Sequence, residues 1–245
     1  MEKYRVGIVG ATGMVGQRFV LLTANHPWFT PVVLAASAHS AGKTYAQAIE
    51  GKWHMAEPIP ESVKSMIVMD AEADAEEIAR QVDFVFCAVN MKKDEIKALE
   101  EKYAKLECPV VSNNSAHRHT PDVPMVVPEI NAGDVKLHHG IISNPNCSTI
   151  ITLTAINALR KLSPIRDMVV STYQAVSGAG AGGPIELQNE VDALRAGKSY
   201  APKVFAHQIA YNVIPQIGGE QCDGYTSEEM KMQNEGRRIL HLSLI

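Results

Sequence analysis

The sequence predicts an α/β fold, in which a doubly wound parallel sheet is followed by an incomplete α+β domain. Through the first half of the chain, apolar runs of strand length alternate with stretches of helical periodicity, as in parallel sheets with crossover helices. From about residue 141 the pattern changes to one long helix, a β-rich run and a glycine cluster. We therefore expect two domains, residues 1–140 and 141–245.

The elements of residues 1–140 follow from periodicity and residue type. Strands are expected where β-branched and apolar residues form short runs, at Tyr4–Val9, Pro31–Ala36, Ile67–Met69, Phe84–Ala88 and Pro109–Ser112. Helices are expected where apolar residues recur at every third or fourth position, at Val15–Ala24, Glu76–Gln81 and Lys93–Leu106. Because strands and helices alternate, this part is predicted to be an open doubly wound sheet.

Residues 141–245 contain fewer strand signals. The expected elements are, in chain order, an extended segment Ile141–Asn144, a helix Cys147–Leu162, a β-rich run Asp167–Ala175 before the glycine cluster Ser177–Gly183, a helix Glu186–Arg195, a strand Tyr211–Ile214 and a helix Ser227–Leu240. So few strands cannot form a well-covered sheet. The last helix also runs directly into the chain end at Ile245, so this domain is predicted to be incomplete.

Composition excludes several classes of protein. The formal net charge is −4 and basic residues are interleaved with acidic ones, so there is no basic stripe for nucleic acid. The sequence has neither a secretion signal nor an apolar stretch of membrane length, so we expect a cytoplasmic protein without a membrane partner. Four widely spaced cysteines without a C-x-x-C pair predict no metal site and no disulfide framework.

A glycine turn follows the first predicted strand and opens the first predicted helix. Its sequence is GATGMVG, from Gly10 to Gly16. Backbone N–H groups and the positive end of a helix at such a turn can bind a pyrophosphate. The spacing is G-x-x-G-x-x-G, and glycines also serve tight turns for steric reasons, so a structural turn is the alternative. The strand and helix on either side favour dinucleotide binding, and hence a Rossmann-type nucleotide-binding domain.

The loop after the second predicted strand indicates which dinucleotide the domain binds. NAD-specific domains place an acidic residue there, which binds the ribose hydroxyls. Here the loop is Ser37–Lys43, which carries two hydroxyls and a lysine but no carboxylate that would repel a 2′-phosphate. NADP is therefore favoured over NAD, with an ordinary polar loop as the alternative.

One of the four cysteines is a candidate nucleophile. Cys147 follows Asn144-Pro145-Asn146 and begins a predicted helix with apolar residues at helical spacing. Helix N-terminal N–H groups stabilise a thiolate and can hold the oxyanion that forms when the thiolate attacks a carbonyl. We assign Asn146 to oxyanion stabilisation or positioning. Cys87 lies inside a strand and is interpreted as a packing residue, while Cys108 and Cys222 have no distinguishing context.

Several segments together resemble the aspartate-semialdehyde dehydrogenase family. Besides the glycine turn and Ser37–Lys43, they are VSNNSAHR at Val111–Arg118, DVPMVVPEIN at Asp122–Asn131, NPNCST at Asn144–Thr149, STYQAVSGAG at Ser171–Gly180 and YTSEEMKM at Tyr225–Met232. They occur in order over essentially the whole chain, and NPNCST with TYQAVSGAG is far more specific than a glycine turn.

The resemblance implies a role for each matching position. The implied cofactor contacts are Gly10, Thr12, Gly13, Met14 and Val15 at the phosphates, Ser37 and Ser40 near the adenosine ribose phosphate, and Ser177 and Gly178 near the nicotinamide. The implied substrate contacts are Arg118 and Lys231 at the phosphate, with Gln174 and Glu228 at the amino-acid portion. From the residues alone, ordinary structural roles are favoured. The two cations are then solvated surface charges, Gln174 is a strand-end polar residue, and Glu228 is an acid in a first helical turn.

The implied reaction is NADPH-dependent reductive dephosphorylation of L-aspartyl 4-phosphate to L-aspartate 4-semialdehyde. It proceeds through a thioester at Cys147 and serves lysine, threonine and methionine biosynthesis. The family is homodimeric, and its base histidine and a carboxylate-binding arginine follow the helix equivalent to Ser227–Leu240. The sequence ends at Ile245, so we expect a truncated chain without them and with impaired activity.

Two other functions are left open. One is an enzyme of the acetylglutamyl-phosphate reductase type, which applies the same thiol chemistry to a substrate longer by one methylene. The other is a non-catalytic NADP-binding remnant that associates with full-length subunits through its second domain.

Overall fold

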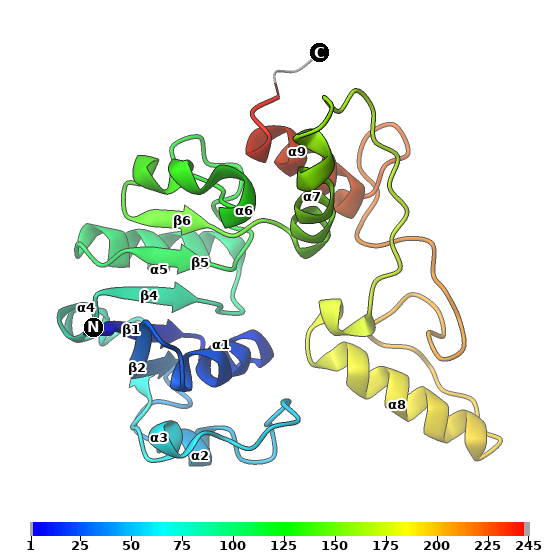
Figure 1. Cartoon of the computed structure of the whole chain (residues 1–245). Helices are drawn as coiled ribbons and strands as arrows, with labels where there is room; N and C mark the ends of the chain where they lie inside the picture. The colour runs from blue at the N-terminus through cyan, green and yellow to red at the C-terminus, as the bar shows by residue number, and fades with distance from the viewer. Residues whose placement is uncertain (1, 243–245) are drawn as a thin grey trace. The chain divides into compact units, whose positions relative to one another are not determined.

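The computed structural model describes residues 2–242; the expected chain end, Ser243–Ile245, lies outside the described residues. The chain divides into two compact units (Figure 1). The first unit comprises Met1–Ala158 with Glu235–Ile245, and the second comprises Leu159–Asn234.

The first unit is built on a six-stranded sheet in the order β3-β2-β1-β4-β5-β6, drawn from blue to green in Figure 1. The strands are β1 (Tyr4–Val9), β2 (Phe29–Ala36), β3 (Met69–Asp70), β4 (Phe84–Cys87), β5 (Val110–Ser112) and β6 (Ile141–Ser143). Every neighbouring pair is parallel. The predicted α/β doubly wound sheet is therefore confirmed, although β3 begins where the predicted strand Ile67–Met69 ends.

Helices connect these strands. They are α1 (Met14–Ala24), α2 (Tyr45–Ala48), α3 (Glu61–Lys64), α4 (Ala75–Gln81), α5 (Lys93–Lys105) and α6 (Pro128–Asn131), with a 3₁₀ helix η1 at Ala132–Leu137. The ends of α1, α4 and α5 lie within one residue of those predicted. The short α2, α3 and α6 were not predicted, because a single helical turn is too short to show periodicity.

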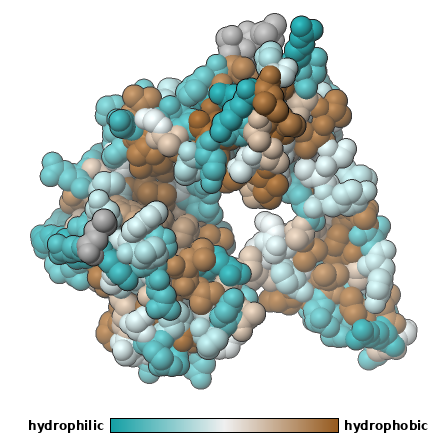
Figure 2. All heavy atoms as spheres, viewed as in Figure 1, coloured by the Kyte–Doolittle hydropathy of each residue, from teal (hydrophilic) through white to brown (hydrophobic). Residues whose placement is uncertain are grey.

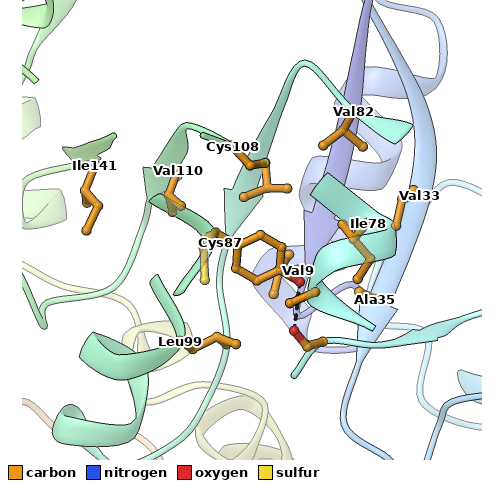
Figure 3. Packing of buried hydrophobic residues seen from close by; sticks show 14 of the residues in the cluster. Val9, Val33, Ala35, Ile78, Val82, Cys87, Leu99, Cys108, Val110 and Ile141 are labelled. Atoms are coloured by element: carbon orange, nitrogen blue, oxygen red, sulfur yellow. Dashed lines mark hydrogen bonds between the residues drawn. The ribbon is translucent and has the colours of Figure 1, made fainter. Parts of the chain in front are cut away.

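Alternating strand residues face opposite sides of the sheet and bury two separate cores. Val9 packs on one side with side chains of α4 and α5, including Ile78 and Leu99 (Figure 3). Its neighbour Ile8 packs on the other side with Val20 of α1 and residues of α2 and α3. Helices therefore cover both faces, which is why the strands read as continuous apolar runs.

The first sheet extends beyond the expected domain boundary at residue 140. β6 pairs with β5 in parallel, so Ile141–Ser143 is the edge strand of this sheet. Helix α7 (Cys147–Arg160) belongs to the first unit as far as Ala158, and the end of α9 (Ser227–Ile239) returns to it. The boundary between the compact units thus falls inside α7 and inside α9. The parts of these helices that belong to the first unit share a core, in which Leu153 clusters with Ile239 and Leu240.

The second unit contains helix α8 (Gly182–Arg195), a 3₁₀ helix η2 (Val176–Ala179) and long extended segments. The predicted strands Asp167–Ala175 and Tyr211–Ile214 are wrong, since neither segment is a strand in the structure. Among the described residues of this unit, β-pairing is limited to one isolated bridge between Glu220 and Thr226. An extended segment becomes a strand only when another strand pairs with its backbone.

The irregular segments of the second unit expose apolar side chains. Figure 2 shows hydrophobic residues, in brown, at the molecular surface among hydrophilic ones. Val169 is 98% exposed and Tyr173 is 91% exposed, and Tyr211 and Val213 are also exposed. Surface this apolar is typical of a protein interface. Separately, none of the helices in residues 2–242 is long and apolar enough to cross a lipid bilayer.

Two carboxylates fold the segment after α8 back onto that helix. Glu186 accepts hydrogen bonds from the backbone N–H groups of Lys203, Val204 and Phe205 at 2.7, 2.8 and 2.9 Å. Glu190 accepts two more, from Ile209 and Ala210 at 2.8 and 2.7 Å. These charge-assisted bonds satisfy backbone groups that a sheet would otherwise pair.

The packing of α7 predicts different effects for two neighbouring leucine-sized side chains. Leu153 is 1% exposed, so Leu153→Ala should cost about 2–5 kcal/mol of unfolding free energy because it leaves a cavity. Ile151 on the same helix is 71% exposed, so Ile151→Ala should change stability by less than about 0.5 kcal/mol. Urea unfolding of both variants measures the difference, and equal effects would contradict the described packing of α7.

Glu186 predicts acid sensitivity of the second unit. Burial by itself raises the pKa of Glu186. The hydrogen bonds from three backbone N–H groups together lower the pKa by more than burial raises it, so it lies below the ordinary 4.5. A carboxylate with a lowered folded pKa contributes stability above its unfolded pKa and loses it as the pH falls through the folded value. The measurement is hydrogen exchange of the amides of residues 203–205, corrected for the intrinsic exchange rate at each pH. We expect their protection to be constant from neutral pH down to about pH 5 and to fall in more acidic solution.

Variants of the same helix test this assignment. Glu186→Gln should lower the protection at neutral pH and flatten its acid dependence. Asp192→Asn on α8 removes a carboxylate that accepts from Gln188, and it should leave the acid dependence as in the wild type. An acid dependence that survives Glu186→Gln would show that another group causes it.

Candidate functional site

Parallel pairing places the carboxyl ends of all six strands at one edge of the sheet. Gly10 follows β1, Ala88 follows β4, Asn113 follows β5 and Asn144 follows β6. The chain runs from β1 to β2 on one side, and β4 lies on the other side of β1. Such a reversal of strand order opens a crevice at the carboxyl edge, where α/β proteins bind ligands.

The glycine turn lies at this reversal and is sterically determined. Gly10 has φ +90°, and a Cβ there would lie 2.5 Å from the carbonyl oxygen of Ala88. A Cβ on Gly16 would lie 2.0 Å from the carbonyl oxygen of Gly10, so α1 packs directly on the turn. Among residues 2–242, no side chain caps the N-terminus of α1 at Gly13, which leaves first-turn N–H groups for a ligand. These residues fit the pyrophosphate of a dinucleotide.

The Ser37–Lys43 loop forms a tight turn directly after β2. The carbonyl oxygen of Ser37 accepts hydrogen bonds from the N–H groups of Ser40 and Ala41 at 2.8 and 3.2 Å. Ser37 and Lys43 are exposed, whereas Ser40 is buried. The turn thus offers an exposed hydroxyl and a cation beside the strand that carries the glycine turn.

Cys147 is the first residue of α7, as predicted. The Asn146 side chain caps this helix, because its Oδ1 accepts from the N–H groups of Ser148 and Thr149 at 2.9 and 3.3 Å. The Cys147 side chain is exposed, and so is that of Cys222 in the second unit. The Cys147 thiol is therefore accessible at a capped helix N-terminus.

The two other cysteines are buried. Cys87, the last residue of β4, is 1% exposed and packs in the core, which confirms its interpretation as a packing residue. Burial raises the pKa of the Cys87 thiol well above its ordinary value, and it raises the pKa of Cys108 to about 11. Both thiols are therefore uncharged and shielded at neutral pH.

A buried carboxylate joins Arg118 to the loop that precedes Cys147, which we call the Cys147 loop (residues 144–147). Glu235 of α9 accepts a hydrogen bond from the backbone N–H of Asn146 at 2.6 Å through Oε2. Its Oε1 lies 3.5 Å from Nη1 of Arg118. Arg118 also donates to the carbonyl oxygens of Asn144 and Asn113, at 3.0 and 3.3 Å. Arg118 is buried in this arrangement and is not a solvated surface charge.

One turn later on α9, Arg238 holds the segment that follows Arg118. Its Nη1 donates to the carbonyl oxygen of Arg118 at 2.7 Å. Its Nη2 donates to the carbonyl oxygens of Thr120 and Pro121 at 3.1 and 3.2 Å, and also to that of Val123. This single side chain fixes a stretch of backbone that has no regular secondary structure.

In the second unit, two of the predicted substrate contacts converge on a third. Gln174 Nε2 donates to Glu228 Oε1 at 3.3 Å, although the two residues lie 54 positions apart. Lys231 Nζ lies 3.1 Å from Glu228 Oε2. The neighbouring Glu229 is exposed and binds the backbone N–H of Thr226 at 2.6 Å, so it caps the helix. The structure thereby distinguishes Glu228 from Glu229, which the sequence could not.

The remaining predicted cofactor contacts of the second unit are Ser177 and Gly178. Both lie on η2 and both are exposed. Nothing hinders a Cβ at Gly178, so this glycine is not required by packing within its unit.

Within residues 2–242, no histidine forms a hydrogen bond with the sulfur of the candidate nucleophile Cys147. This sulfur lies 3.9 Å from Ser148 Oγ. His117 is buried, with Nε2 3.9 Å from Glu100, and His241 lies 3.1 Å from Asp134. The described residues also contain no cluster of His, Cys, Asp or Glu that could hold a metal ion.

Sequence reasoning missed Glu235, Arg238 and Asn113. For Glu235 and Arg238 the helical spacing was a usable signal. Glu235 follows Glu228 by seven residues and Arg238 follows Lys231 by seven, so each lies on the same helix face as a predicted site residue. For Asn113, whose side chain accepts from Asn144 at 2.8 Å, no signal distinguishes it from an ordinary loop residue.

Comparison with known families identifies the chain. A sequence model described as "Semialdehyde dehydrogenase, NAD binding domain" matches residues 5–138, more than half of the chain. The chain belongs to the semialdehyde dehydrogenase family. A second model, "Semialdehyde dehydrogenase, dimerisation domain", matches residues 156–244.

Similar proteins carry a more specific name. Aspartate-semialdehyde dehydrogenase of Aquifex aeolicus is 42% identical over 244 residues, which cover 97% of this chain and 66% of that protein. The Bacillus subtilis enzyme of the same name is 35% identical over 245 residues, with coverages of 97% and 65%. The semialdehyde dehydrogenase chain described here therefore spans slightly less than two thirds of the length of these relatives.

Solved structures agree with this family. A crystal structure of aspartate semialdehyde dehydrogenase II from Vibrio cholerae, complexed with ASA, has a TM-score of 0.83 and 32% identity, covering 98% of this chain and 67% of that one. The Candida albicans enzyme with NADP has a TM-score of 0.72 and 28% identity, with coverages of 98% and 60%.

The glycine turn predicts a large difference between two glycines. Gly16→Ala should destabilise the first unit by at least roughly 1–3 kcal/mol, because the new methyl would collide with backbone rather than with a flexible side chain. Gly133→Ala is the matched control, because its Cβ meets nothing within 4 Å. Urea unfolding measures both, and a Gly16→Ala variant as stable as the control would contradict the close packing of α1 on the turn.

Proposed function

We propose that this chain binds NADP and accepts an acyl group on its cysteine thiol, as an aspartate-semialdehyde dehydrogenase does. The observation that carries the proposal is an exposed Cys147 at a capped helix N-terminus, in a loop that one buried carboxylate links to Arg118. The names of the similar proteins support the same function.

In the first half-reaction the Cys147 thiolate attacks the acyl carbon of L-aspartyl 4-phosphate. A carbon–sulfur bond forms, the bond from carbon to the phosphate oxygen breaks, and inorganic phosphate leaves. Asn146, whose side chain caps the start of α7, is assigned to positioning Cys147 or to stabilising the oxyanion of the tetrahedral intermediate. Arg118 receives the departing phosphate, because a guanidinium matches phosphate geometry.

Three residues of the second unit are proposed to recognise the rest of the substrate. Lys231 is assigned to phosphate, while Gln174 and Glu228 are assigned to the amino-acid portion. Their mutual contacts support this assignment, since Glu228 offers a buried carboxylate for an ammonium and is held between an amide and a lysine.

The second half-reaction reduces the thioester to the aldehyde and regenerates the Cys147 thiol. NADPH, when bound, supplies the hydride. The proposed contacts are Gly10 and Thr12 to Val15 at the phosphates, Ser37 and Ser40 at the adenosine ribose phosphate, and Ser177 and Gly178 at the nicotinamide. The carboxylate-free turn at residues 37–43 favours NADP over NAD.

The finer assignments rest on chemistry and on the named relatives. Aspartyl phosphate is favoured over the longer acetylglutamyl phosphate because the relatives named above are aspartate-semialdehyde dehydrogenases. A homodimer is supported by the match to a dimerisation domain and by the exposed apolar side chains of the second unit. The mixed surface charge supports neither a nucleic-acid partner nor a membrane partner, and the proposed location is the cytoplasm.

Acylation of the thiol tests the proposed function directly. Incubation of the purified chain with L-aspartyl 4-phosphate should release one equivalent of inorganic phosphate per chain and attach an aspartyl group to the peptide that contains Cys147. Mass spectrometry locates the group, and hydroxylamine should remove it as expected for a thioester. Cys147→Ala should abolish both signals.

Cys222→Ser is the matched control, because Cys222 is the other exposed cysteine. This variant should acylate like the wild type. Release of phosphate without acylation of Cys147 would exclude the proposed chemistry. NADPH binding without any acylation would instead support a non-catalytic nucleotide-binding protein.

A further inference from the structure

The buried carboxylate of Glu235 contacts both segments assigned to the first half-reaction. It is 1% exposed, and its two oxygens have different partners. Oε2 holds the backbone N–H of Asn146 at 2.6 Å, while Oε1 faces Arg118 at 3.5 Å. One side chain thus links the residue before Cys147 to the cation assigned to phosphate.

The contact with Arg118 is electrostatic and is not a completed hydrogen bond. A separation of 3.5 Å exceeds the 2.7–3.2 Å of ordinary N–H···O bonds. Within residues 2–242, Oε1 accepts no hydrogen bond. Arg118 directs Nε and Nη2 to backbone carbonyls, which leaves Nη1, the nitrogen nearest Glu235, for another acceptor.

Stability alone gives little reason for such a pair. Removing two charges from water offsets most of their attraction, and apolar residues of similar volume often replace buried ion pairs without loss of stability. The pair does have an effect on ligand binding, because any anion that reaches Arg118 has to share its charge with Glu235. The carboxylate therefore weakens the anion site at Arg118 while it anchors the Cys147 loop.

We propose that Glu235 is a positioning residue that fixes the Cys147 loop through Asn146 and lowers the affinity of Arg118 for phosphate. The inference rests on the proposed function, because it takes Arg118 as the phosphate ligand. Its consequence is that phosphate, the product of the first half-reaction, is held weakly enough to leave.

Inorganic phosphate is the probe, and its affinity for the purified chain is measured by calorimetry. In Glu235→Gln, phosphate should bind about tenfold more tightly than in the wild type, because a negative charge close to the anion is removed. Arg118→Gln should abolish this binding. Glu229→Gln, an equally conservative change on the same helix at an exposed carboxylate, should leave the affinity unchanged.

Hydrogen exchange of the peptide containing residues 144–149 reports on the anchoring role. It should be faster in Glu235→Gln, in which the Asn146 N–H loses its charged acceptor. Glu235→Asp keeps the charge but is shorter by one methylene, so exchange should again be faster while phosphate affinity stays within about twofold of the wild type. The Asp variant keeps the proposal testable if the Gln variant does not fold.

The outcomes separate the inference from the function on which it rests. Wild-type phosphate binding that depends on Arg118, but that weakens or does not change in Glu235→Gln, overturns the role of Glu235 and leaves the function intact. A merely structural role predicts that result, since a disordered site binds phosphate less well. Exchange that is unchanged in Glu235→Asp overturns the anchoring role. Phosphate binding that survives Arg118→Gln overturns both the assignment of Arg118 and this inference.

Discussion

Parallel pairing of the six strands is the constraint on which the first unit depends. It brings the ends of β1, β4, β5 and β6 to one edge, although long stretches of sequence separate them. At that edge Gly10 lies so near the carbonyl oxygen of Ala88 that even a methyl group would not fit. A glycine after β1 therefore allows the ends of the first and fourth strands to lie this close.

Charged side chains hold the backbone of the loops at this edge. The core around Leu153 secures α7 and the end of α9, but it is not what holds the backbone groups next to Arg118 and Cys147. Glu235 and Arg238 extend from α9 to their backbone groups instead. Backbone groups of irregular loops need partners as much as those of helices do, and a buried charge supplies strong ones. The cost is desolvation, which makes each of these side chains sensitive to loss of its partner.

The second unit shows what happens when extended chain has no neighbouring strand. Val169 and Tyr173 belong to a β-rich run, yet they are almost fully exposed and the run is not a strand. Order near α8 comes from Glu186 and Glu190, which bind backbone N–H groups that a sheet ladder would otherwise pair. Strand propensity is present in this run, but pairing with another strand is what makes a β-strand.

The sequence by itself determined the longer elements of the first unit, namely β1, β2, β4, β5, α1, α4 and α5. Buried strands appear as short apolar runs, and amphipathic helices repeat apolar residues at every third or fourth position. It also determined that Cys147 begins a helix, since Asn146 and the apolar spacing that follows are local signals. Only the tertiary structure decided that β6 closes the first sheet, that Gln174 contacts Glu228, and that Glu235 joins Asn146 to Arg118. Helical spacing puts Glu235 on the same face of α9 as Glu228, but it cannot say which distant backbone that face meets, because those contacts form only when the chain folds.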